Sequence, residues 1–246
     1  MTGAERRSRS LSPRVVLVVA AHPDDEILGC GGTMARHADQ GDEVRILILA
    51  EGSTSRAAVR DPSDPTISLL RTAAAAAADI VGAKPPRFGG FPDQRLDSVD
   101  ALDITKVIED EIETAAPSVV YTHHGNDLNR DHRIVHDACL AAARPLLGSS
   151  VREVYTFETL SSTEWSSGAM GGGFVPQRFV EITEQMERKQ EALAAYTTEM
   201  RDFPHPRSHA AVEALARVRG ATVGVHAAEA FGVVRSVVVG NQRPVG

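Results

Sequence analysis

The chain has 246 residues, of which 42% are hydrophobic and 24% are charged. This is the composition of an ordinary globular protein, and the length is sufficient for one α/β domain with a large buried core. The formal net charge of -7 argues against a nucleic-acid-binding protein, because binding to phosphates requires clustered lysines and arginines.

Neither the N-terminal residues nor the cysteines indicate export. No apolar run approaches the roughly 20 residues needed to span a bilayer, and residues 1–13 contain arginines without the apolar segment of a signal peptide. Cys30 and Cys139 both fall in stretches that favour buried helix, so we expect no disulfide. We therefore expect one cytoplasmic domain, residues 1–246, with residues 1–13 as a flexible arm.

The first 50 residues predict a β-α-β unit. Residues 14–20 form a continuous β-branched apolar run, which is typical of a parallel strand buried on both faces. Residues 24–40 have helical spacing and are followed by Gly41, a residue that commonly caps helices. Residues 43–50 then predict a second buried strand, joined to the first by a right-handed crossover.

Helices and strands continue to alternate to about residue 160. This alternation predicts an α/β fold, a Rossmann-like three-layer sandwich with a mostly parallel sheet. The expected elements, in chain order, are a helix at 66–81, a strand at 87–91, a helix at 102–115, a strand at 118–122, a helix at 130–146 and a strand at 151–158.

The pattern after residue 160 is less regular. A loop at 161–173 holds Trp165, for which a sugar-binding role and a packing role are equally good interpretations. We expect helices near 184–200 and 206–219, and a last strand at 232–239 that closes one edge of the sheet.

The most informative segment, residues 21–26 (AHPDDE), directly follows the first buried strand. Binding sites in open α/β sheets form at the carboxyl ends of strands. His22 and Asp25 are three residues apart across a turn and can converge on one zinc ion. Asp24 would then lie beside the metal and could accept a proton from the water that the metal activates. An acidic first turn of a helix is the alternative interpretation, but it does not explain His22.

A second cluster, residues 123–133, follows a different buried strand and should lie at the same edge of the sheet. Catalytic zinc usually has three protein ligands and one open position, so a third ligand is needed. We expect His132 to be that ligand. Asp131 would be the carboxylate that orients a metal-bound imidazole.

The two clusters together resemble those of the LmbE/PIG-L superfamily of zinc-dependent N-deacetylases. The matching motifs are the leading A-H-P-D-D-E and the later x-x-D-H at residues 129–132, and the similarity extends over most of the chain. Members act on acetylglucosaminyl lipids, thiol precursors, chitobiose and glycosylated antibiotics. The resemblance therefore implies an LmbE-like fold and a small amino-sugar substrate.

The same resemblance implies roles for individual residues. It supports His22, Asp25 and His132 as zinc ligands and Asp24 as the general base. Further similarity covers segments at 90–97, 161–165 and 228–231, the last with the sequence AEAF.

One position departs from the family pattern. The better-known form of the second motif is H-P-D-H, whose first histidine is thought to stabilise the oxyanion, whereas this chain has Asn129. An amide can donate a hydrogen bond but cannot carry a proton to the leaving amine. This role is either shared with Asp24 or moved to one of three other residues, which are His123, His124 and His226. Chitobiose-type deacetylases use a histidine from the C-terminal part, which favours His226.

The resemblance also points to substrate-binding residues. Arg71 stands where the family often shows R-x-x-E, and Asp93 follows the strand at 87–91; both suit sugar hydroxyls, with Asn129 as a third contact. The family glutamate is replaced by Ala74, so the ion-pair partner of Arg71 is in doubt. A surface arginine on a helix is the alternative interpretation.

The sequence therefore predicts a metal-dependent hydrolase that removes an N-acyl group, above all acetyl, from an amino-sugar-containing small molecule. Water activated by Zn²⁺ would attack the carbonyl, with Asp24 as base; Fe²⁺ and Co²⁺ suit similar ligands. We expect no nucleic-acid partner and no membrane span, and the oligomeric state, a homo-oligomer included, stays open.

Three alternatives remain at this point. An amidase for a longer acyl chain or a glycosyl-thiol conjugate is the nearest, and a non-catalytic sugar- or metal-binding protein on the same fold is the second. A dinucleotide-binding oxidoreductase is the third alternative. It has little support, because Gly29, Gly31 and Gly32 do not have the spacing of a dinucleotide-binding fingerprint. These glycines are better explained by close packing of a helix on the sheet.

Overall fold

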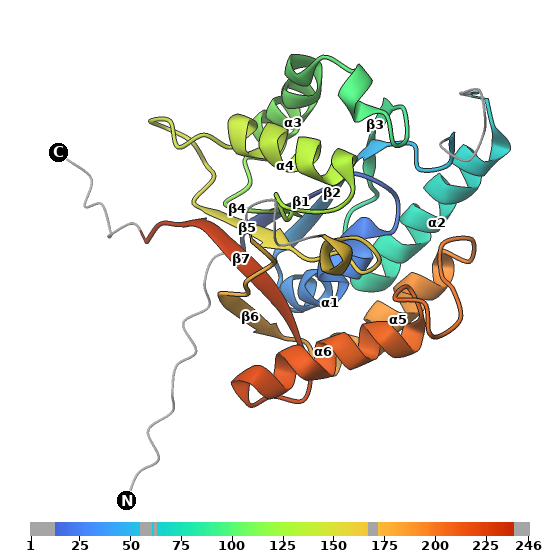
Figure 1. The fold of residues 1–246 in the computed structure, drawn as a ribbon. Coiled ribbons are helices and arrows are strands. Elements are labelled where there is room, and N and C mark those ends of the chain that lie inside the picture. The colour runs from blue at the N-terminus through green and yellow to red at the C-terminus, as the bar shows by residue number, and fades with distance from the viewer. Residues whose placement is uncertain (1–12, 55–60, 62, 167–171, 239–246) are drawn as a thin grey trace, which may run out of the picture.

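Seven strands form one sheet with the order β3-β2-β1-β4-β5-β7-β6 (Figure 1). The structure is a computed structural model that describes residues 13–54, 61, 63–166 and 172–238, so all but the last residue of the expected arm lies outside the described residues. The strands are β1 (Val15–Ala20), β2 (Glu43–Ala50), β3 (Arg87–Phe91), β4 (Val119–His123), β5 (Glu153–Phe157), β6 (Arg178–Glu181) and β7 (Ala228–Ser236).

The sheet is mostly parallel, as the sequence predicts. β1 pairs in parallel with β2 and β4, and parallel pairing continues to β3 on one side and to β5 on the other. β7 runs antiparallel to both β5 and β6. The chain builds the sheet outward from β1 to β3 and then returns to add β4 beside β1. At such a switch point the loops after the two strands diverge and leave a crevice.

Helices cover both faces of the sheet and give the expected three layers (Figure 1). α3 and α4 pack together on one face, whereas α1, α2 and α5 contact one another on the other face, and α6 lies against β7. The helices are α1 (Asp25–Asp39), α2 (Pro65–Val81), α3 (Ala101–Ala115), α4 (Arg130–Ala142), α5 (Met186–Ala195) and α6 (His209–Val223).

β1 shows why its sequence is apolar throughout. Val16 and Val18 belong to the core under α1, α2 and α5, whereas Leu17 and Val19 belong to the core under α3 and α4. All four residues are completely buried. A strand that is covered on both faces needs apolar side chains at successive positions, which places β1 at the centre of the fold.

The glycines in α1 allow close packing, as the sequence predicts. A Cβ atom at Gly29 would lie 2.2 Å from the ring of Phe157, and one at Gly32 would lie 2.8 Å from Ile182. Such distances are far below van der Waals contact, so α1 approaches β5 as closely as it does only because these residues have no side chain.

The C-terminal part differs from the sequence-based expectations. The last strand begins at Ala228 rather than at residue 232, and it lies between β5 and β6 instead of at an edge. β6 was not predicted, because four residues are too few to show a clear alternation. The helix expected to reach residue 200 ends at Ala195, and the next begins at His209.

Cys30 and Cys139 are free and buried, which confirms that they form no disulfide. No helix within the described ranges combines the length and the apolar character that crossing a bilayer requires. The cytoplasmic location stays a prediction.

Candidate active site

The two polar clusters meet at the carboxyl edge of the sheet, because β1 and β4 are parallel neighbours. The first turns of two helices then position the acidic and imidazole side chains. Asp25 is the first residue of α1, and His132 lies in the first turn of α4. The side chain of Asn129 caps α4 by accepting a hydrogen bond from the backbone N–H of Asp131 at 2.9 Å.

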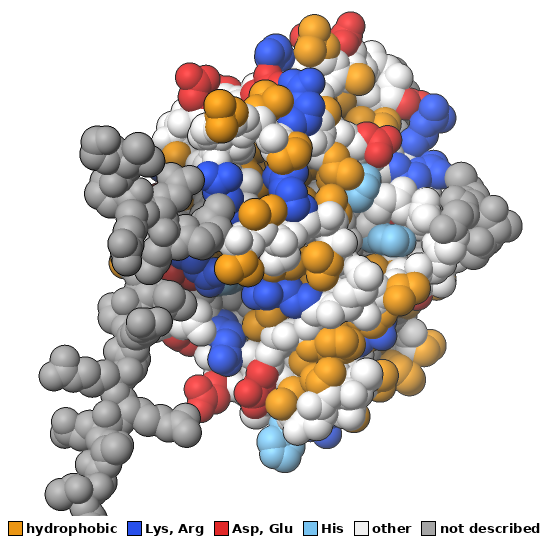
Figure 2. All heavy atoms as spheres, turned by 90° about the vertical axis from the view of Figure 1, so that its left-hand side faces the viewer, with side chains coloured by type: hydrophobic (Ala, Val, Ile, Leu, Met, Phe, Trp, Pro, Cys, Tyr) orange, Lys and Arg blue, Asp and Glu red, His pale blue; other side chains and the backbone are white. Residues whose placement is uncertain are grey.

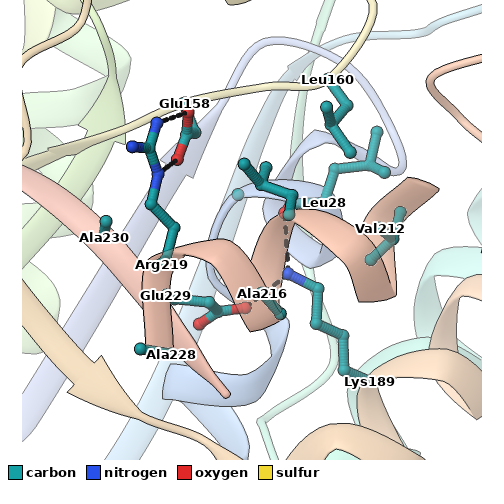
Figure 3. Close-up of a pocket in the computed structure, with 12 residues that line it drawn as sticks. Leu28, Glu158, Leu160, Lys189, Val212, Ala216, Arg219, Ala228, Glu229 and Ala230 are labelled. Carbon is teal, nitrogen blue, oxygen red and sulfur yellow. Dashed lines mark hydrogen bonds and ion pairs between the residues drawn. The ribbon is translucent and has the colours of Figure 1, made fainter. Parts of the chain in front are cut away.

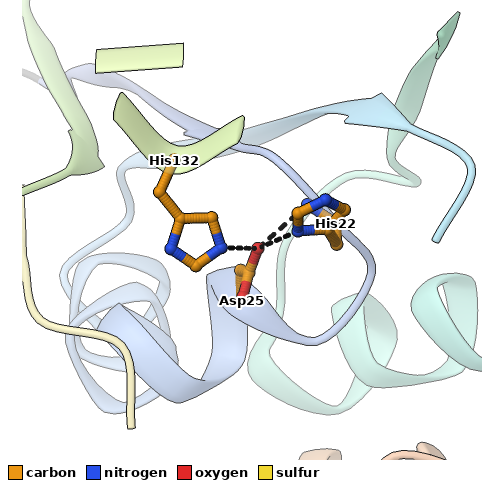
Figure 4. A group of neighbouring side chains, drawn as sticks. All are labelled: His22, Asp25 and His132. Carbon is orange, nitrogen blue, oxygen red and sulfur yellow. Dashed lines mark hydrogen bonds and ion pairs between the residues drawn. The ribbon is translucent and has the colours of Figure 1, made fainter. Parts of the chain in front are cut away.

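His22, Asp25 and His132 form a buried cluster (Figure 4). Nδ1 of His22 lies 3.1 Å from Oδ2 of Asp25, and Nε2 of His132 lies 3.2 Å from the same oxygen. One potential ligand atom from each residue lies within 4.8 Å of the others. The structure thus brings together the three residues that the sequence suggests as metal ligands.

The protein alone does not satisfy the polar atoms of this cluster. Oδ1 of Asp25 is buried without a hydrogen-bond partner among the described residues, and the two ring nitrogens of His132 are buried and lie 3.2 Å from carboxylate oxygens of Asp25 and Asp127 without hydrogen-bond geometry. Unpartnered polar atoms are rare in protein interiors and destabilise the fold. Two imidazoles and one carboxylate form the ligand set of several catalytic zinc sites. A divalent metal therefore fits the donor atoms that are present.

Carboxylates also surround His22 on its other side. Nε2 of His22 lies 3.2 Å from Asp131 and 3.3 Å from Asp93. Burial alone would lower the pKa of His22, but its interactions with Asp131, Asp25 and Asp93 raise it to about 10. Burial would raise the pKa of Asp25, but His132 and His22 hold it well below its usual range. The cluster attracts positive charge, and metal binding would release the proton from His22.

His22 belongs to a second potential metal-binding group, with Asp93 and Asp131. The group with two imidazoles matches zinc better, so we assign Asp131 to the orientation of His22. The sequence did not show which imidazole Asp131 would orient. The carboxylate that can orient His132 is that of Asp127, because Oδ1 of Asp127 lies 3.2 Å from Nδ1 of His132.

Asp24 lies beside the cluster in an unusual backbone conformation. Its φ is 104°, a region that favours glycine, so the surrounding packing must hold it there. Oδ2 accepts a hydrogen bond from Nη1 of Arg207 at 2.8 Å, whereas Oδ1 is buried and has no hydrogen-bond partner among the described residues. Burial raises the pKa of Asp24 well above its usual value, and the charge of Arg207 opposes this shift. One oxygen is fixed, and the other faces no donor from the part of the chain that the structure describes.

A hollow of about 140 Å³ opens at Asp24. Asp93 reaches this hollow from the turn after β3, so the structure brings it to the site as the sequence predicts. The hollow is lined almost entirely by polar side chains, which are those of His22, Asp24, Asp93, Gln94, Glu199 and Arg207, together with Pro23 and Gly52.

Arg207 and Glu199 were not predicted from the sequence. They lie between α5 and α6, and Arg207 is 183 positions away from Asp24. Nε of Arg207 donates to Oγ of Ser161 at 2.8 Å, and Nη1 lies 3.6 Å from Oε2 of Glu199. No motif marks these residues. The one available signal is physical, because a carboxylate buried beside a metal cluster needs a cationic partner.

The structure does not bring His226 or His124 to the hollow beside Asp24. His226 is exposed and lines a separate hollow with Thr183 and Met186, next to α6. His124 lines another hollow and packs its ring edge-on against Phe174. The structure of one chain therefore places His226 away from the cluster, because the loop before β7 follows directly from the end of α6.

His123 and Arg71 also have other contacts. His123 is completely buried, its Nε2 accepts a hydrogen bond from Ala21 N–H at 2.9 Å, and its ring stacks on that of His132 at 3.9 Å. It thus packs against His132, one of the candidate ligands, and does not line the hollow. Arg71 is exposed and places its guanidinium 5.1 Å from the ring centre of Phe88, so it is a surface arginine in this structure.

A buried His-Asp-His group at the switch point of an open α/β sheet is the arrangement that the resemblance to the LmbE/PIG-L superfamily implies. Comparison with protein families agrees, since the PIG-L family, described as GlcNAc-PI de-N-acetylase, matches residues 17–143. This match covers just over half of the chain. The protein belongs to the PIG-L family, which confirms the resemblance found in the sequence.

Several relatives in this family are named as deacetylases. The uncharacterized deacetylase YaiS of Escherichia coli K12 is 28% identical over 175 residues, covering 69% of this chain and 83% of that protein. The 1D-myo-inositol 2-acetamido-2-deoxy-alpha-D-glucopyranoside deacetylase of Gordonia bronchialis is 26% identical over 241 residues, covering 77% and 85%.

Solved structures share the fold at low identity. The N,N'-diacetylchitobiose deacetylase of Pyrococcus horikoshii superposes with a TM-score of 0.70 at 20% identity, over 91% of this chain and 85% of that chain. GalB, the 4-carboxy-2-hydroxymuconate hydratase of Pseudomonas putida, gives a TM-score of 0.74 at 21% identity, over 94% and 100%. The second match shows that this fold hosts more than one reaction, so the reaction of a given member is decided by its site residues and not by its fold.

Proposed function

We propose that the protein is a metal-dependent hydrolase that removes the N-acetyl group of a small amino-sugar compound. The observation that carries this proposal is the buried cluster of His22, Asp25 and His132, with the carboxylate of Asp24 beside it in a small polar hollow. The named activities of the relatives in Escherichia coli and Gordonia bronchialis support a deacetylase.

The metal would be held by His22, Asp25 and His132. When bound there, a divalent ion would polarise the amide carbonyl and lower the pKa of a water molecule towards about 7. We propose Zn²⁺, because two imidazoles and one carboxylate suit it well, although Fe²⁺ and Co²⁺ accept the same donors.

Asp24 is proposed as the general base. Arg207 fixes Oδ2, so Oδ1 is the atom that takes the proton from the attacking water. The water oxygen forms a bond to the acetyl carbon, the bond from this carbon to nitrogen then breaks, and Asp24 returns the proton to the departing amine. Acetate and a free amine are the products. Positioned proton transfer of this kind typically accelerates a reaction by about 10²- to 10⁴-fold.

Arg207 is proposed to stabilise the developing oxyanion in place of a histidine. Asn129 uses its side-chain oxygen to cap α4, and His226 lies outside the hollow. Among the described residues that line the hollow, Arg207 carries the only guanidinium or ammonium group. A donor in this role typically lowers the barrier by about 2.7 to 4 kcal/mol.

The hollow favours acetyl over a longer acyl group. Its volume of about 140 Å³ is below the 300 to 1,000 Å³ that is typical of sites for drug-sized ligands, and its lining is polar. It thus suits an acetamido group and part of one sugar ring. Asp93 and Gln94 are proposed to bind sugar hydroxyls, because both line the hollow beside His22.

A substrate screen tests this proposal. Zinc-loaded protein would be incubated with N-acetylated amino sugars, their glycosides and matched N-octanoyl analogues, and both acetate and free amine would be measured. We expect release of acetate, with the octanoyl analogues inert. Release of the longer acid would indicate an amidase of broader type. Saturable sugar binding without any product would indicate a non-catalytic sugar-binding protein.

A further inference from the structure

Helix α1 is broken at Cys30, five residues after its first residue, Asp25. Cys30 has φ -149° and ψ 25°, which are not helical values, although residues on both sides are helical. In a regular α-helix the N–H of Gly32 would donate to the carbonyl of Leu28, four residues earlier. A break at this point leaves buried backbone groups that need other partners.

A buried ion pair supplies these partners (Figure 3). Glu229 of β7 accepts hydrogen bonds from the N–H of Gly32 at 3.0 Å and from the N–H of Thr33 at 2.6 Å. Lys189 of α5 donates to the carbonyl of Leu28 at 2.9 Å and to Glu229 at 2.6 Å. The ion pair therefore bridges the two halves of the helix, with its anion on N–H groups that follow the break and its cation on a carbonyl that precedes it.

Stability by itself does not explain this pair. The side chains of Lys189 and Glu229 are only 4% and 5% exposed, and removing two charges from water offsets most of their attraction. Apolar residues of similar size would be as stabilising in many proteins. Apolar residues, however, cannot form the hydrogen bonds that Lys189 and Glu229 make to the carbonyl of Leu28 and the N–H of Gly32. The pair is thus suited to hold the helix in its broken form.

The broken form determines where the N-terminal half of α1 lies. This half carries Asp25, whose carboxylate lies beside the imidazole of His132. Gly29, in the same half, packs against the ring of Phe157. If α1 were regular at Cys30, its N-terminal half would lie at a different angle to β5. Asp25, which belongs to that half, would move with it. The position of Asp25 therefore depends on what happens at the break.

We propose that the Lys189–Glu229 pair is a positioning device for the metal ligand Asp25, acting through the break in α1. This inference rests on the proposed metal centre. It also gives a role to the AEAF segment at 228–231, which the catalytic site leaves without one, because its glutamate bonds from β7 to the backbone of α1. Loss of a group that orients a ligand typically weakens metal binding by about 10- to 100-fold.

Lys189→Met and Glu229→Gln test this proposal, with Glu158→Gln as the matched control. Glu158 forms a two-point ion pair with Arg219, at 2.8 and 2.7 Å, and lines the same small cavity of about 20 Å³ as the Lys189–Glu229 pair (Figure 3). It has no hydrogen bond to α1 among those of the described residues. The control therefore removes a nearby charge pair without touching the break.

Three measurements are made on full-length protein under conditions where urea titration shows each variant to be folded. They are the Zn²⁺ dissociation constant from chelator competition, the visible absorption spectrum of the Co²⁺-loaded protein, and the hydrogen-exchange rate of the Thr33 amide. For Lys189→Met and Glu229→Gln we expect Zn²⁺ binding weakened by about 10- to 100-fold, an altered Co²⁺ spectrum and faster exchange. Glu158→Gln should lose stability but keep all three. Lys189→Arg keeps the charge and should restore most of the affinity.

Two results would separate the inference from the function on which it rests. Wild-type affinity and an unchanged Co²⁺ spectrum in both Lys189→Met and Glu229→Gln would overturn the positioning role and leave the metal centre intact. Wild-type protein that binds neither Zn²⁺ nor Co²⁺ would overturn the metal centre itself, and the positioning of a ligand with it. Should Lys189→Met not fold, Glu229→Gln alone decides between these outcomes.

Discussion

Arg207 donates a hydrogen bond to Oδ2 of Asp24 at 2.8 Å, and Oδ1 has no hydrogen-bond partner in the described ranges of the chain. The donor is itself held, because its Nε bonds to Ser161 at 2.8 Å. Two loops from the C-terminal half thus fix the orientation of a carboxylate that the N-terminal motif supplies. This contact connects the candidate base to the candidate oxyanion donor, and it can be tested from both sides.

Replacement of Arg207 should affect the transition state more than substrate binding. For Arg207→Met we expect kcat to fall by about 10²- to 10³-fold with unchanged zinc content, and guanidine added to the solution should restore part of the rate. Arg201→Met is the control, because Arg201 lies in the same segment, is exposed, and donates to the carbonyl of Met200. Equal rates for Arg207→Met and wild type would remove Arg207 from the mechanism.

Asp24→Asn should keep the metal and lose most of the turnover. The amide preserves the shape of the side chain and does not disturb the three ligands, but it cannot accept a proton, so kcat should fall by about 10²- to 10⁴-fold. Zinc content by elemental analysis and rate of acetate release are measured together. Asp97→Asn, on the surface, serves as the control. A near-normal rate with retained zinc would show that another group is the base.

His132→Ala should abolish stoichiometric zinc binding, since it leaves two ligands where catalytic zinc usually has three. His226→Ala should keep both zinc and turnover, because His226 is exposed and lines a different hollow. Elemental analysis after dialysis gives the comparison. Tightly held zinc in His132→Ala would contradict the ligand assignment, and a large loss of kcat in His226→Ala would return this residue to the site.

Acid should destabilise the protein through His37. This histidine is buried, with Nδ1 2.7 Å from Asp42 and Nε2 3.1 Å from the hydroxyl of Tyr121. Burial lowers its pKa below the usual value, despite the opposing effect of Asp42. The unfolded chain therefore takes up a proton near pH 6.5 while the folded protein does not, so this contribution to stability is lost as pH falls below about 6.5. Urea titrations of wild type and His37→Gln between pH 8 and pH 5 should show a flatter dependence for the variant.

Much of the fold and of the metal cluster could be predicted from the sequence because the relevant information is local. The apolar run of β1 indicates a strand buried on both faces, and His22 and Asp25 are only three residues apart. His132 follows another buried strand, and the rule that sites form at the carboxyl ends of parallel strands is sufficient to bring it to the other two. These inferences need no knowledge of how distant helices pack.

Only the tertiary structure decided which long-range partners complete the site. Arg207 is 183 positions from Asp24, and Glu229 is 197 positions from Gly32, so no local spacing could indicate either contact. His226 has a favourable position in the sequence, but the path of the loop before β7 takes it away from the cluster. These outcomes depend on how α5, α6 and β7 pack against α1, and such packing is set by the summed contacts of the whole core.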